Sequence, residues 1–451
     1  MKAISIFGLG YVGLCTAACF ADRGFKVIGV DIDENKVKLL ARGNSPIYEP
    51  GLEPTLRMAT KAGRFLPTTD AKSALDSSDI SIITVNTPSK AGGGIDLKHV
   101  ESAARNVGSA MRESTNYHLV VIRSTVTPGT TQNVVKPILE RFSLKSCGRD
   151  FGLCMNPEFL QEGDAIRGVL EPDRIVIGEF DKRSGDELKK LYRDFYREKM
   201  PPLIRTNLST AEMIKYANNA FLATKISFIN FIAGLCEKVE GADVELVAKA
   251  IGMDHRINPK FLRAGAGFGG SCFPKDVKAL INFSRDLDLE PVLLEDVLKT
   301  NEGQAAHMVE LAKNKLGELR EKRVALLGLS FKPETDDIRE APSIKIIKRL
   351  LKEGAEVVVY DPAAMNNVRK IFANKIAHAN SSIGTLAGAD CCMIVTEWAE
   401  FSKLSPDDFK AKMKNALVID GRRIYNPEVF SKKLDYVAIG LGGKRGKWAR
   451  I

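Results

Sequence analysis

The sequence lacks the cysteine pattern of secreted and zinc-binding proteins. Its 451 residues include eight cysteines, yet no two of them form a C-x-x-C pair, and most lie inside apolar runs. Disulfide frameworks and structural zinc sites depend on paired, regularly spaced cysteines. We therefore expect reduced thiols, as in a cytoplasmic protein.

Histidine is equally scarce. The five histidines stand at positions 99, 118, 255, 307 and 378, and their spacing fits no metal-binding motif. We expect ordinary core or surface histidines and no bound metal.

Long apolar runs are missing as well. A membrane-spanning helix needs roughly 18 or more apolar residues in succession, and no such run occurs. The N-terminal residues resemble a signal peptide, with Lys2 before an apolar stretch, but glycines at positions 8, 10 and 13 interrupt that stretch. We expect neither a signal peptide nor contact with a membrane.

Acidic residues do not balance the basic ones, and the net charge is +10. From Lys410 onward the chain holds eleven Lys or Arg and only three acids, so most of the excess lies near the C-terminus. No aromatic-basic recognition motif accompanies the charge, and a nucleotide substrate would use it equally well. We expect no nucleic-acid partner, and we predict a flexible basic tail from Gly440 onward.

The chain does contain a dinucleotide-binding pattern. Gly8-Leu-Gly10-Tyr-Val-Gly13 stands between a predicted strand and a predicted helix, and Asp31 follows the last glycine by about 18 residues. Such glycines let a pyrophosphate approach the helix N-terminus. Asp31 would hold the ribose hydroxyls and repel a 2′-phosphate, which favours NAD over NADP, and Lys36 could counter the phosphates. The alternative is a tight strand-helix turn that binds nothing. The predicted cofactor contacts here are Gly8, Gly10, Tyr11, Val12, Gly13, Asp31 and Lys36.

Further buried strands follow the first two. Apolar runs at 80–85, 119–122 and 151–155 are typical of parallel strands, and ligands bind at the carboxyl ends of such strands. Thr125 and Glu158 stand just beyond two of these ends, so we expect them to face one crevice. Ordinary turn chemistry is the alternative explanation.

A long helix is predicted next. Ser209-Thr-Ala-Glu212 reads as a capping box, and nothing interrupts the helix for about 28 residues. We expect it to link two domains and to form a subunit contact. Lys215 and Asn219 are four residues apart and share one face.

The segment 265–276 concentrates reactive groups. Cys272 follows four closely spaced glycines, which would let a ligand lie against bare backbone. Lys275, or the start of the helix that Asp276 opens, would favour thiolate over thiol at Cys272. An inert cysteine in a glycine-rich surface loop is the alternative.

From Arg323 onward the C-terminal part shows the same strand-turn-helix order, but it lacks the glycine motif. This difference suggests a mononucleotide diphosphate as its ligand. Lys332, Arg339, Arg422 and Arg423 stand at loop positions suited to phosphates. We predict an α/β fold of two Rossmann-like domains with mostly parallel sheets, joined by a long central helix. The predicted divisions are an NAD-binding domain at 1–205, a central helical region with the cysteine loop at 206–300, and a nucleotide-diphosphate-binding domain with the tail at 301–451.

Several motifs together carry a family resemblance over nearly the whole chain. They are Gly8-Leu-Gly-Tyr-Val-Gly13, Pro46-Ile-Tyr-Glu-Pro-Gly51, Asn86-Thr-Pro88, Asn156-Pro-Glu-Phe-Leu160, Gly267-Phe-Gly-Gly-Ser-Cys272 and Phe331-Lys332. The sequence resembles the UDP-glucose/GDP-mannose dehydrogenase family. The resemblance implies a homodimer around the central helix and an NAD-dependent, four-electron oxidation of a sugar C6 alcohol to a carboxylate. UDP-glucose is the favoured substrate, with GDP-mannose or a UDP-N-acetylhexosamine as alternatives.

The resemblance also implies residue roles. The nucleophile would be Cys272, with Lys215, Asn219 and Asp276 around the reacting carbon, and Thr125 with Glu158 in acid-base work. The substrate contacts would be Glu158, Phe159, Leu160, Lys215, Asn219, Arg256, Phe261, Gly267, Phe273 and Lys332, and Arg256 would reach across the dimer. Further cofactor contacts would be Thr87, Thr125, Glu162, Lys275 and Arg339.

The residue chemistry agrees with these roles. A thiolate can add to the intermediate aldehyde, and a second hydride loss leaves a thioester that water hydrolyses. Lys215 and Asn219 would stabilise the oxyanion. A nucleotide-sugar-binding protein without turnover is the competing function, and the presence of Cys272 argues against it.

Overall fold

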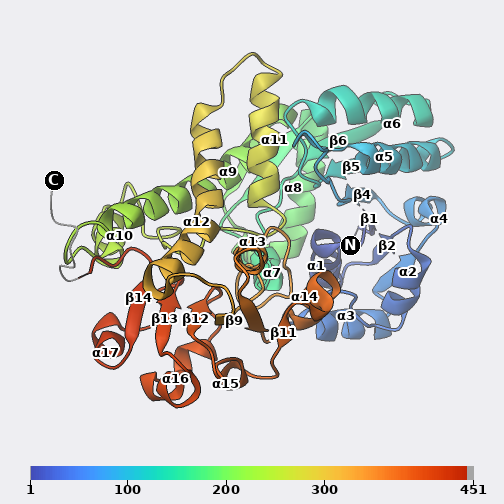
Figure 1. The fold of residues 1–451 in the computed structure, drawn as a ribbon. Coiled ribbons are helices and arrows are strands. Elements are labelled where there is room, and N and C mark those ends of the chain that lie inside the picture. Colours follow the sequence, from blue (N-terminus) through green and yellow to red (C-terminus); the bar gives the residue numbers. More distant parts are fainter. Residues whose placement is uncertain (1, 444–451) are drawn as a thin grey trace. The chain divides into compact units, whose positions relative to one another are not determined.

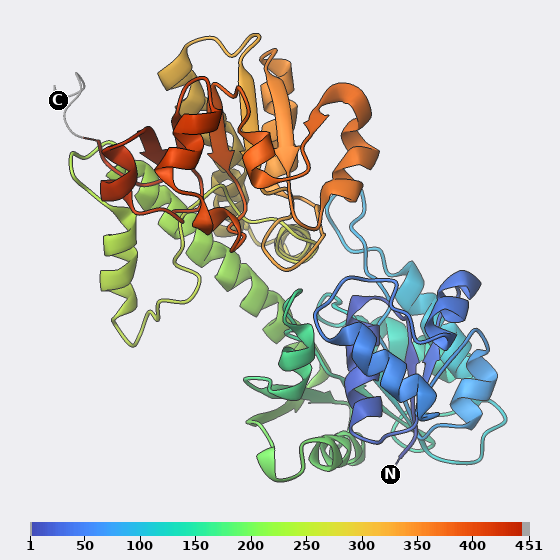
Figure 2. The same ribbon diagram turned by 90° about the horizontal axis from the view of Figure 1, so that it is seen from below.

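The computed structural model describes residues 2–443. The chain divides into two compact units, Met1–Asn218 and Asn219–Ile451. Each unit is built on one sheet with helices around it (Figure 1, Figure 2). Residues 444–451, which make up most of the predicted basic tail, lie outside the described residues.

The first unit contains an eight-stranded sheet of order β3-β2-β1-β4-β5-β6-β7-β8. All neighbouring strands are parallel except β6 and β7, which are antiparallel. The strands are β1 (Ile4–Phe7), β2 (Val27–Val30), β3 (Phe65–Thr68), β4 (Ile80–Ile83), β5 (His118–Ile122), β6 (Phe151–Met155), β7 (Ile175–Glu179) and β8 (Leu203–Asn207).

Helices and short helical turns connect these strands. They are α1 (Tyr11–Asp22), α2 (Glu34–Ala41), α3 (Leu52–Lys61), α4 (Ala71–Asp76), α5 (Lys98–Met111), the π-helical turn η1 (Thr131–Val135), α6 (Lys136–Ser143), α7 (Ala165–Leu170), α8 (Lys182–Tyr196) and the 3-10 turn η2 (Arg197–Lys199). Every residue of β1, β2, β4, β5 and β6 is buried. This is why the central strands are continuous apolar runs rather than alternating ones.

The second unit contains a six-stranded, all-parallel sheet of order β11-β10-β9-β12-β13-β14. Its strands are β9 (Arg323–Leu327), β10 (Glu356–Tyr360), β11 (Ala377–His378), β12 (Cys391–Ile394), β13 (Leu417–Asp420) and β14 (Asp435–Ala438). Its helical segments are α10 (Val244–Gly252), α11 (Phe273–Arg285), α12 (Val292–Leu316), α13 (Pro342–Lys352), α14 (Met365–Phe372), η3 (Ala373–Lys375), α15 (Ser382–Thr385), η4 (Phe401–Lys403), α16 (Pro406–Lys412) and α17 (Pro427–Ser431).

Both sheets share one topology. In chain order, the six strands of the second sheet follow the same 3-2-1-4-5-6 arrangement as the first six strands of the first sheet. This is the doubly wound order of dinucleotide-binding folds. The predicted fold class, two Rossmann-like domains with mostly parallel sheets and a long central helix, is confirmed. The predicted three-part division at 205 and 300 stays a prediction.

The long helix is α9 (Leu208–Cys236), with 29 residues. Its predicted capping box is wrong. The Thr210 N–H donates to Asn207 Oδ1 at 2.8 Å, while the Glu212 carboxylate accepts bonds from Gly129 and Thr131 instead. Glu212 therefore binds backbone amides of a distant loop instead of the amide at its own helix start that the capping-box pattern predicted.

By length and apolar content, α9 alone among the described helices could cross a membrane, although Lys215 and Lys225 interrupt its apolar residues. Within its most apolar window, 44% is buried inside the protein. A core helix of a globular protein passes the same test.

Candidate active site

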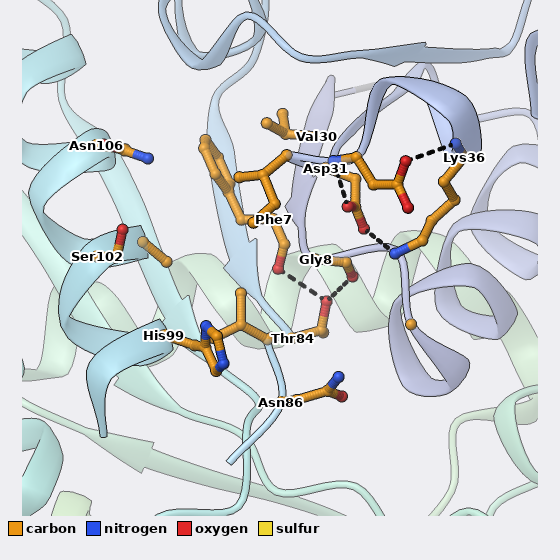
Figure 3. Close-up of a pocket in the computed structure, with 15 residues that line it drawn as sticks. Phe7, Gly8, Val30, Asp31, Lys36, Thr84, Asn86, His99, Ser102 and Asn106 are labelled. Carbon is orange, nitrogen blue, oxygen red and sulfur yellow. Dashed lines mark hydrogen bonds and ion pairs between the residues drawn. The ribbon is translucent and has the colours of Figure 1, made fainter. Parts of the chain in front are cut away.

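A cavity of about 310 Å³ opens in the first unit beyond the carboxyl ends of β1, β2 and β4. Figure 3 shows its lining: Thr84 lies against Phe7 and Gly8, Asp31 points to Lys36, and α5 contributes His99. Ligands bind at this edge of a doubly wound sheet, where the strand order reverses. The predicted cofactor residues Gly8, Gly10, Asp31 and Lys36 therefore share one cavity.

Asp31 is held by a network of donors. Its carboxylate accepts the Leu9 N–H at 2.9 Å, the Asp33 N–H at 3.0 Å and the Lys36 ammonium at 2.7 Å. Burial alone would raise the pKa of Asp31, but the Lys36 and backbone bonds outweigh it and lower that pKa below its ordinary value. Asp31 is thus ionised at neutral pH. Lys36 is bound to Asp31, and its predicted role beside the phosphates stays a prediction.

Gly13 allows α1 to start close against β1. A Cβ there would stand 2.0 Å from the Gly8 carbonyl oxygen and 2.7 Å from Thr84 Oγ1. No side chain caps the N-terminus of α1, whose Ncap is Gly10. The bare glycine turn, the uncapped amides and the ionised Asp31 fit a dinucleotide with its pyrophosphate at the helix start.

Glu158 and Lys215 form a buried ion pair in the same unit. The Lys215 ammonium donates to Glu158 Oε1 at 3.0 Å and to the Glu158 carbonyl oxygen at 2.7 Å. The Leu160 N–H donates to the other carboxylate oxygen at 2.5 Å. Burial would raise the pKa of Glu158, but the Lys215 charge and the Leu160 N–H bring it below its ordinary value. Phe159 lies beneath the Lys215 ammonium, 5.4 Å from ring centre to nitrogen.

The sequence pattern assigned Glu212 to a capping box, but in the structure this residue holds the Thr125 loop. Glu212, fully buried on α9, accepts the Gly129 N–H at 2.6 Å, the Thr131 N–H at 2.8 Å and the Thr131 hydroxyl at 2.6 Å. Burial raises the pKa of Glu212 to about 7. The first turns of α9 thus hold the Thr125 loop through Glu212 and the Glu158 loop through Lys215.

Cys272 lies in the second unit at the Ncap of α11, and its side chain is exposed. One turn into α11 the buried Asp276 carboxylate accepts Asn219 Nδ2 at 2.6 Å and the Lys275 ammonium at 2.5 Å. The structure therefore brings Cys272, Lys275 and Asp276 together at one helix start, with Asn219 of α9 bound to it. Anionic sulfur is favoured at such a position.

The other cysteines differ from Cys272. All eight lie in the described part of the chain, and only Cys272 is exposed. Burial raises the pKa of the Cys19 and Cys147 thiols to about 12. It also raises the pKa of the thiols of Cys15, Cys154, Cys236, Cys391 and Cys392. These seven are protonated and unreactive at neutral pH.

Two asparagines that the sequence pattern did not single out hold the glycine loop. Asn230 Oδ1 accepts the Gly265 N–H at 2.8 Å, and Asn301 binds the Phe268 N–H at 2.7 Å and the Phe268 carbonyl at 2.9 Å. Gly267 has φ +101°, and a Cβ there would stand 2.8 Å from Asn301 Oδ1. A Cβ at position 265, 269 or 270 would also clash with protein atoms. The glycines thus serve close packing of the loop, whereas the sequence suggested room for a ligand.

The remaining predicted substrate contacts of the second unit are spread over several loops. Phe261, with φ +67°, and Phe273 have ring centres 6.1 Å apart, and the exposed Arg256 pairs with Asp254. Lys332 lies 5.8 Å from the Phe331 ring centre, and Arg339 pairs with Asp337 at 2.7 Å.

The arginine pair is held by protein groups. Arg422 Nε donates to the Val395 carbonyl at 2.6 Å. The Arg423 side chain, 4% exposed, donates to Asp243 at 2.8 Å and to the Ile439 carbonyl at 3.0 Å. A phosphate-binding role of this pair stays a prediction.

The predicted site residues therefore fall into two groups. The first unit holds the glycine turn, Asp31, Lys36, Thr87, Thr125, Glu158, Phe159, Leu160, Glu162 and Lys215. The second unit holds Asn219, Arg256, Phe261, Gly267, Cys272, Phe273, Lys275, Asp276, Lys332, Arg339, Arg422 and Arg423.

Comparisons with known proteins agree with this description. The family models of the UDP-glucose/GDP-mannose dehydrogenases match 2–196 as the NAD binding domain, 209–303 as the central domain and 325–427 as the UDP binding domain. The UDP-glucose 6-dehydrogenase of Haloferax volcanii is 45% identical over 422 residues, which cover 93% of this chain and 96% of that protein. The GDP-mannose 6-dehydrogenase of Pseudomonas putida is 44% identical over 386 residues, covering 84% and 86%.

A solved structure is similar over the same extent. The UDP-glucose dehydrogenase from the hyperthermophilic archaeon Pyrobaculum islandicum is 37% identical, covers 98% of both chains and superposes with a TM-score of 0.90. The predicted cofactor, NAD, is confirmed by the NAD binding domain match and by the dehydrogenase relatives. With all three family models matched in order, the chain belongs to the UDP-glucose/GDP-mannose dehydrogenase family and is an NAD-dependent oxidoreductase.

Proposed function

We propose that the protein oxidises the C6 alcohol of UDP-glucose to a carboxylate, which gives UDP-glucuronate. The observation that carries this proposal is Cys272, an exposed thiol at the start of α11 next to the Asn219–Asp276–Lys275 cluster. An alcohol dehydrogenase that stops at the aldehyde has no use for a nucleophile at this place. In a four-electron oxidation, a thiol can hold the intermediate aldehyde as a covalent adduct until the second hydride is lost.

The cavity lined by Gly8 and Asp31 would hold NAD⁺, and two NAD⁺ molecules bound in succession would each take one hydride. Between the two oxidations, the Cys272 sulfur attacks the aldehyde carbon and forms a thiohemiacetal. Loss of the second hydride turns this adduct into a thioester, and water then cleaves the carbon–sulfur bond, which releases the carboxylate and restores the thiol. The covalent link also prevents escape of the aldehyde.

Lys215 and Asn219 stabilise the oxyanion that develops at the reacting carbon. They are one helical turn apart on α9, and each is held by an acid, Lys215 by Glu158 and Asn219 by Asp276. These bonds fix the side chains before the substrate arrives, so little reorganisation is needed during reaction.

Glu158 serves as the base that activates the hydrolytic water, with Thr125 positioned on the neighbouring loop. Its lowered pKa keeps the carboxylate ionised throughout the neutral range. A base contributes typically 10²–10⁴-fold to such a step.

The second unit binds the nucleotide diphosphate. This assignment rests on the match of 325–427 to a UDP binding domain and on Lys332, Arg339, Arg422 and Arg423 near the strand ends. The enzyme acts in the cytoplasm, where its free cysteines persist as thiols.

A panel of nucleotide sugars tests the substrate. UDP-glucose, GDP-mannose and UDP-N-acetylhexosamines are compared by initial rates of NADH formation and by total NADH per sugar. We expect the highest kcat/KM with UDP-glucose and about two NADH per sugar. GDP-mannose is the second candidate because of the Pseudomonas putida relative. Absence of NADH with every sugar, in a protein that still binds them, indicates a binding protein without turnover.

A further inference from the structure

The segment 46–51, Pro-Ile-Tyr-Glu-Pro-Gly, has no role in the chemistry described so far. It precedes α3 and is conformationally restricted. Pro46 and Pro50 fix φ on both sides of Glu49, and Gly51 at φ +78° starts α3. The Leu52 N–H closes the turn by donating to the Glu49 carbonyl at 3.2 Å. Glu49 thus projects from a stiff backbone.

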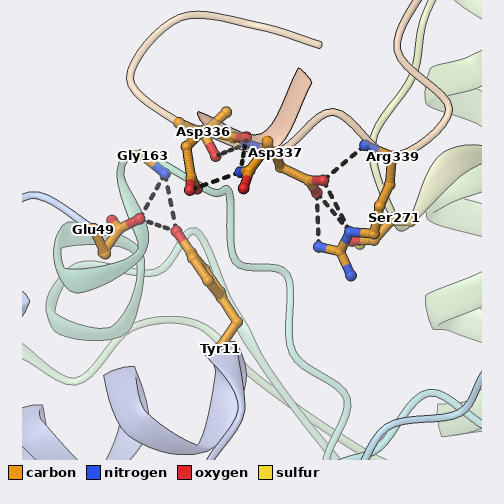
Figure 4. A network of polar contacts seen from close by, with 10 residues as sticks. Tyr11, Glu49, Gly163, Ser271, Asp336, Asp337 and Arg339 are labelled. Atoms are coloured by element: carbon orange, nitrogen blue, oxygen red, sulfur yellow. Dashed lines mark hydrogen bonds and ion pairs between the residues drawn. The ribbon is translucent and has the colours of Figure 1, made fainter. Parts of the chain in front are cut away.

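The Glu49 carboxylate is buried among donors from two other segments (Figure 4). Oε1 accepts the Ala165 N–H at 2.7 Å. Oε2 accepts the Gly163 N–H at 2.7 Å and the Tyr11 hydroxyl. The Gly163 N–H also lies 2.9 Å from the Tyr11 hydroxyl oxygen, so the three groups form a closed triangle.

These donors belong to the two parts of the first unit that handle cofactor and catalysis. Tyr11 is the first residue of α1, directly after the glycine turn at the cofactor cavity. Gly163 ends the loop that begins at Asn156 and carries Glu158 and Glu162, and Ala165 begins α7. One carboxylate therefore joins the cofactor turn to the far end of the catalytic loop, while Lys215 holds its near end.

We propose that Glu49 is a positioning residue that braces the catalytic loop against the cofactor turn. The inference rests on the proposed function for the role of Glu158, but the brace itself is local to the first unit. A carboxylate accepts stronger hydrogen bonds than a neutral oxygen does, so the two amide bonds hold the loop more firmly than backbone contacts alone, and the third bond ties it to Tyr11. Placement errors of about 1 Å at a reacting group cost roughly 10²-fold in rate.

Glu49→Gln tests the proposed role of Glu49 with almost no change in the size of the side chain. Glutamine offers one acceptor oxygen and one NH₂ donor, so at least one of the Gly163 and Ala165 amides must face a donor. Tyr11→Phe removes only the hydroxyl and leaves both amide bonds. Glu140→Gln is the matched control, because Glu140 also accepts a backbone amide, that of Cys147 at 3.1 Å, and pairs with Lys136, both outside the brace.

Two readouts separate the brace from general stability. Hydrogen exchange at one or both of the Gly163 and Ala165 amides should accelerate at least about tenfold in Glu49→Gln, because at least one of them loses its acceptor. With UDP-glucose, kcat should fall roughly 10²-fold, and the Kd for NAD⁺ should rise because Tyr11 loses its anchor. Tyr11→Phe should accelerate exchange at Gly163 more than at Ala165. Glu140→Gln should leave all these values unchanged.

The outcomes distinguish this inference from the proposed function. Exchange and NAD⁺ binding report on the brace even if the wild-type enzyme oxidises no sugar, which would overturn the function alone. Unchanged exchange at both amides in Glu49→Gln would overturn the brace. So would an unchanged kcat in an enzyme whose wild type is active. If Glu49→Gln does not fold, Tyr11→Phe decides, and unchanged exchange at Gly163 contradicts the proposal.

Discussion

The protonation of a buried residue in this protein depends on partners far away in the sequence, and Glu212 is the clearest example. None of the donors to its carboxylate carries a positive charge, because they are the amides of Gly129 and Thr131 and the Thr131 hydroxyl. Burial is the leading cause that raises its pKa from the ordinary 4.5 to about 7. The folded protein therefore keeps a proton on Glu212 over a range in which the unfolded chain has lost it.

This difference predicts a pH-dependent stability. The folded state binds more protons than the unfolded state between about pH 4.5 and 7, so the contribution is fully present below that window and is lost as the pH rises through it. Across the window the loss amounts to roughly 3 kcal/mol.

Glu212→Gln, which cannot ionise, isolates this contribution. Urea unfolding of both proteins between pH 5 and 8 should show the variant gaining stability relative to wild type as the pH rises. Glu34→Gln, at an exposed position in α2 that pairs with Lys38, is the control and should show no such trend. A difference between wild type and Glu212→Gln that stays constant with pH contradicts the assigned pKa.

At the scale of elements, α9 presents the proposed catalytic residues Lys215 and Asn219 on one side and exposed apolar residues on another. Phe221, Phe228, Phe231 and Leu235 are 65, 50, 58 and 49% exposed. At 3.6 residues per turn they lie within roughly 80° of one another on the helix, while Asn219 projects from nearly the opposite side. Exposed apolar stripes of this kind are typical of protein interfaces. We propose that a second copy of the chain covers it, so that α9 pairs with α9 of the partner.

Phe228→Glu tests this contact. In a symmetric dimer each chain brings the new carboxylate to the same interface. Both carboxylates lose their water on association, which disfavours the dimer. Light scattering after size exclusion should find a dimer for wild type and a monomer for Phe228→Glu. Ile371→Glu, on the exposed side of α14, is the control and should remain a dimer. A monomeric wild type, or a dimeric Phe228→Glu, contradicts this interface.

The elements also show which features the sequence could predict. The buried strands at the centre of each sheet, α1 and α9 were predictable because apolar runs and the glycine motif are local patterns. Strands β3, β7, β11 and β14 were not predicted. The capping box at Ser209 was wrong because Glu212 found stronger partners in the loop at 129–131. Asn230 and Asn301 were missed because nothing in the sequence next to either residue reveals the distant backbone group that it binds.

At the scale of the whole molecule, the sheet topology of each unit followed from the order of strands and helices, and the family from motifs spread along the chain. Cys272 and Glu158 were predictable as site residues because they stand in distinctive motifs. Glu49 and Glu212 also stand in sequence patterns, but their partners were not predictable, because no local pattern shows which distant backbone amides a buried carboxylate binds. The proposed reaction uses Cys272 and Glu158 in successive steps.

The most direct test of that assignment is a single-turnover experiment with Glu158→Gln. Without the base, hydrolysis should slow by roughly 10²–10⁴-fold while hydride transfer is less affected. We predict a burst of about two NADH per active site, as two hydride losses precede the thioester, and then a stall. Mass spectrometry of the stalled enzyme should find one sugar-nucleotide acyl group on the peptide that contains Cys272, and none in Cys272→Ala. Normal turnover of Glu158→Gln, or an adduct that survives removal of Cys272, would contradict the account.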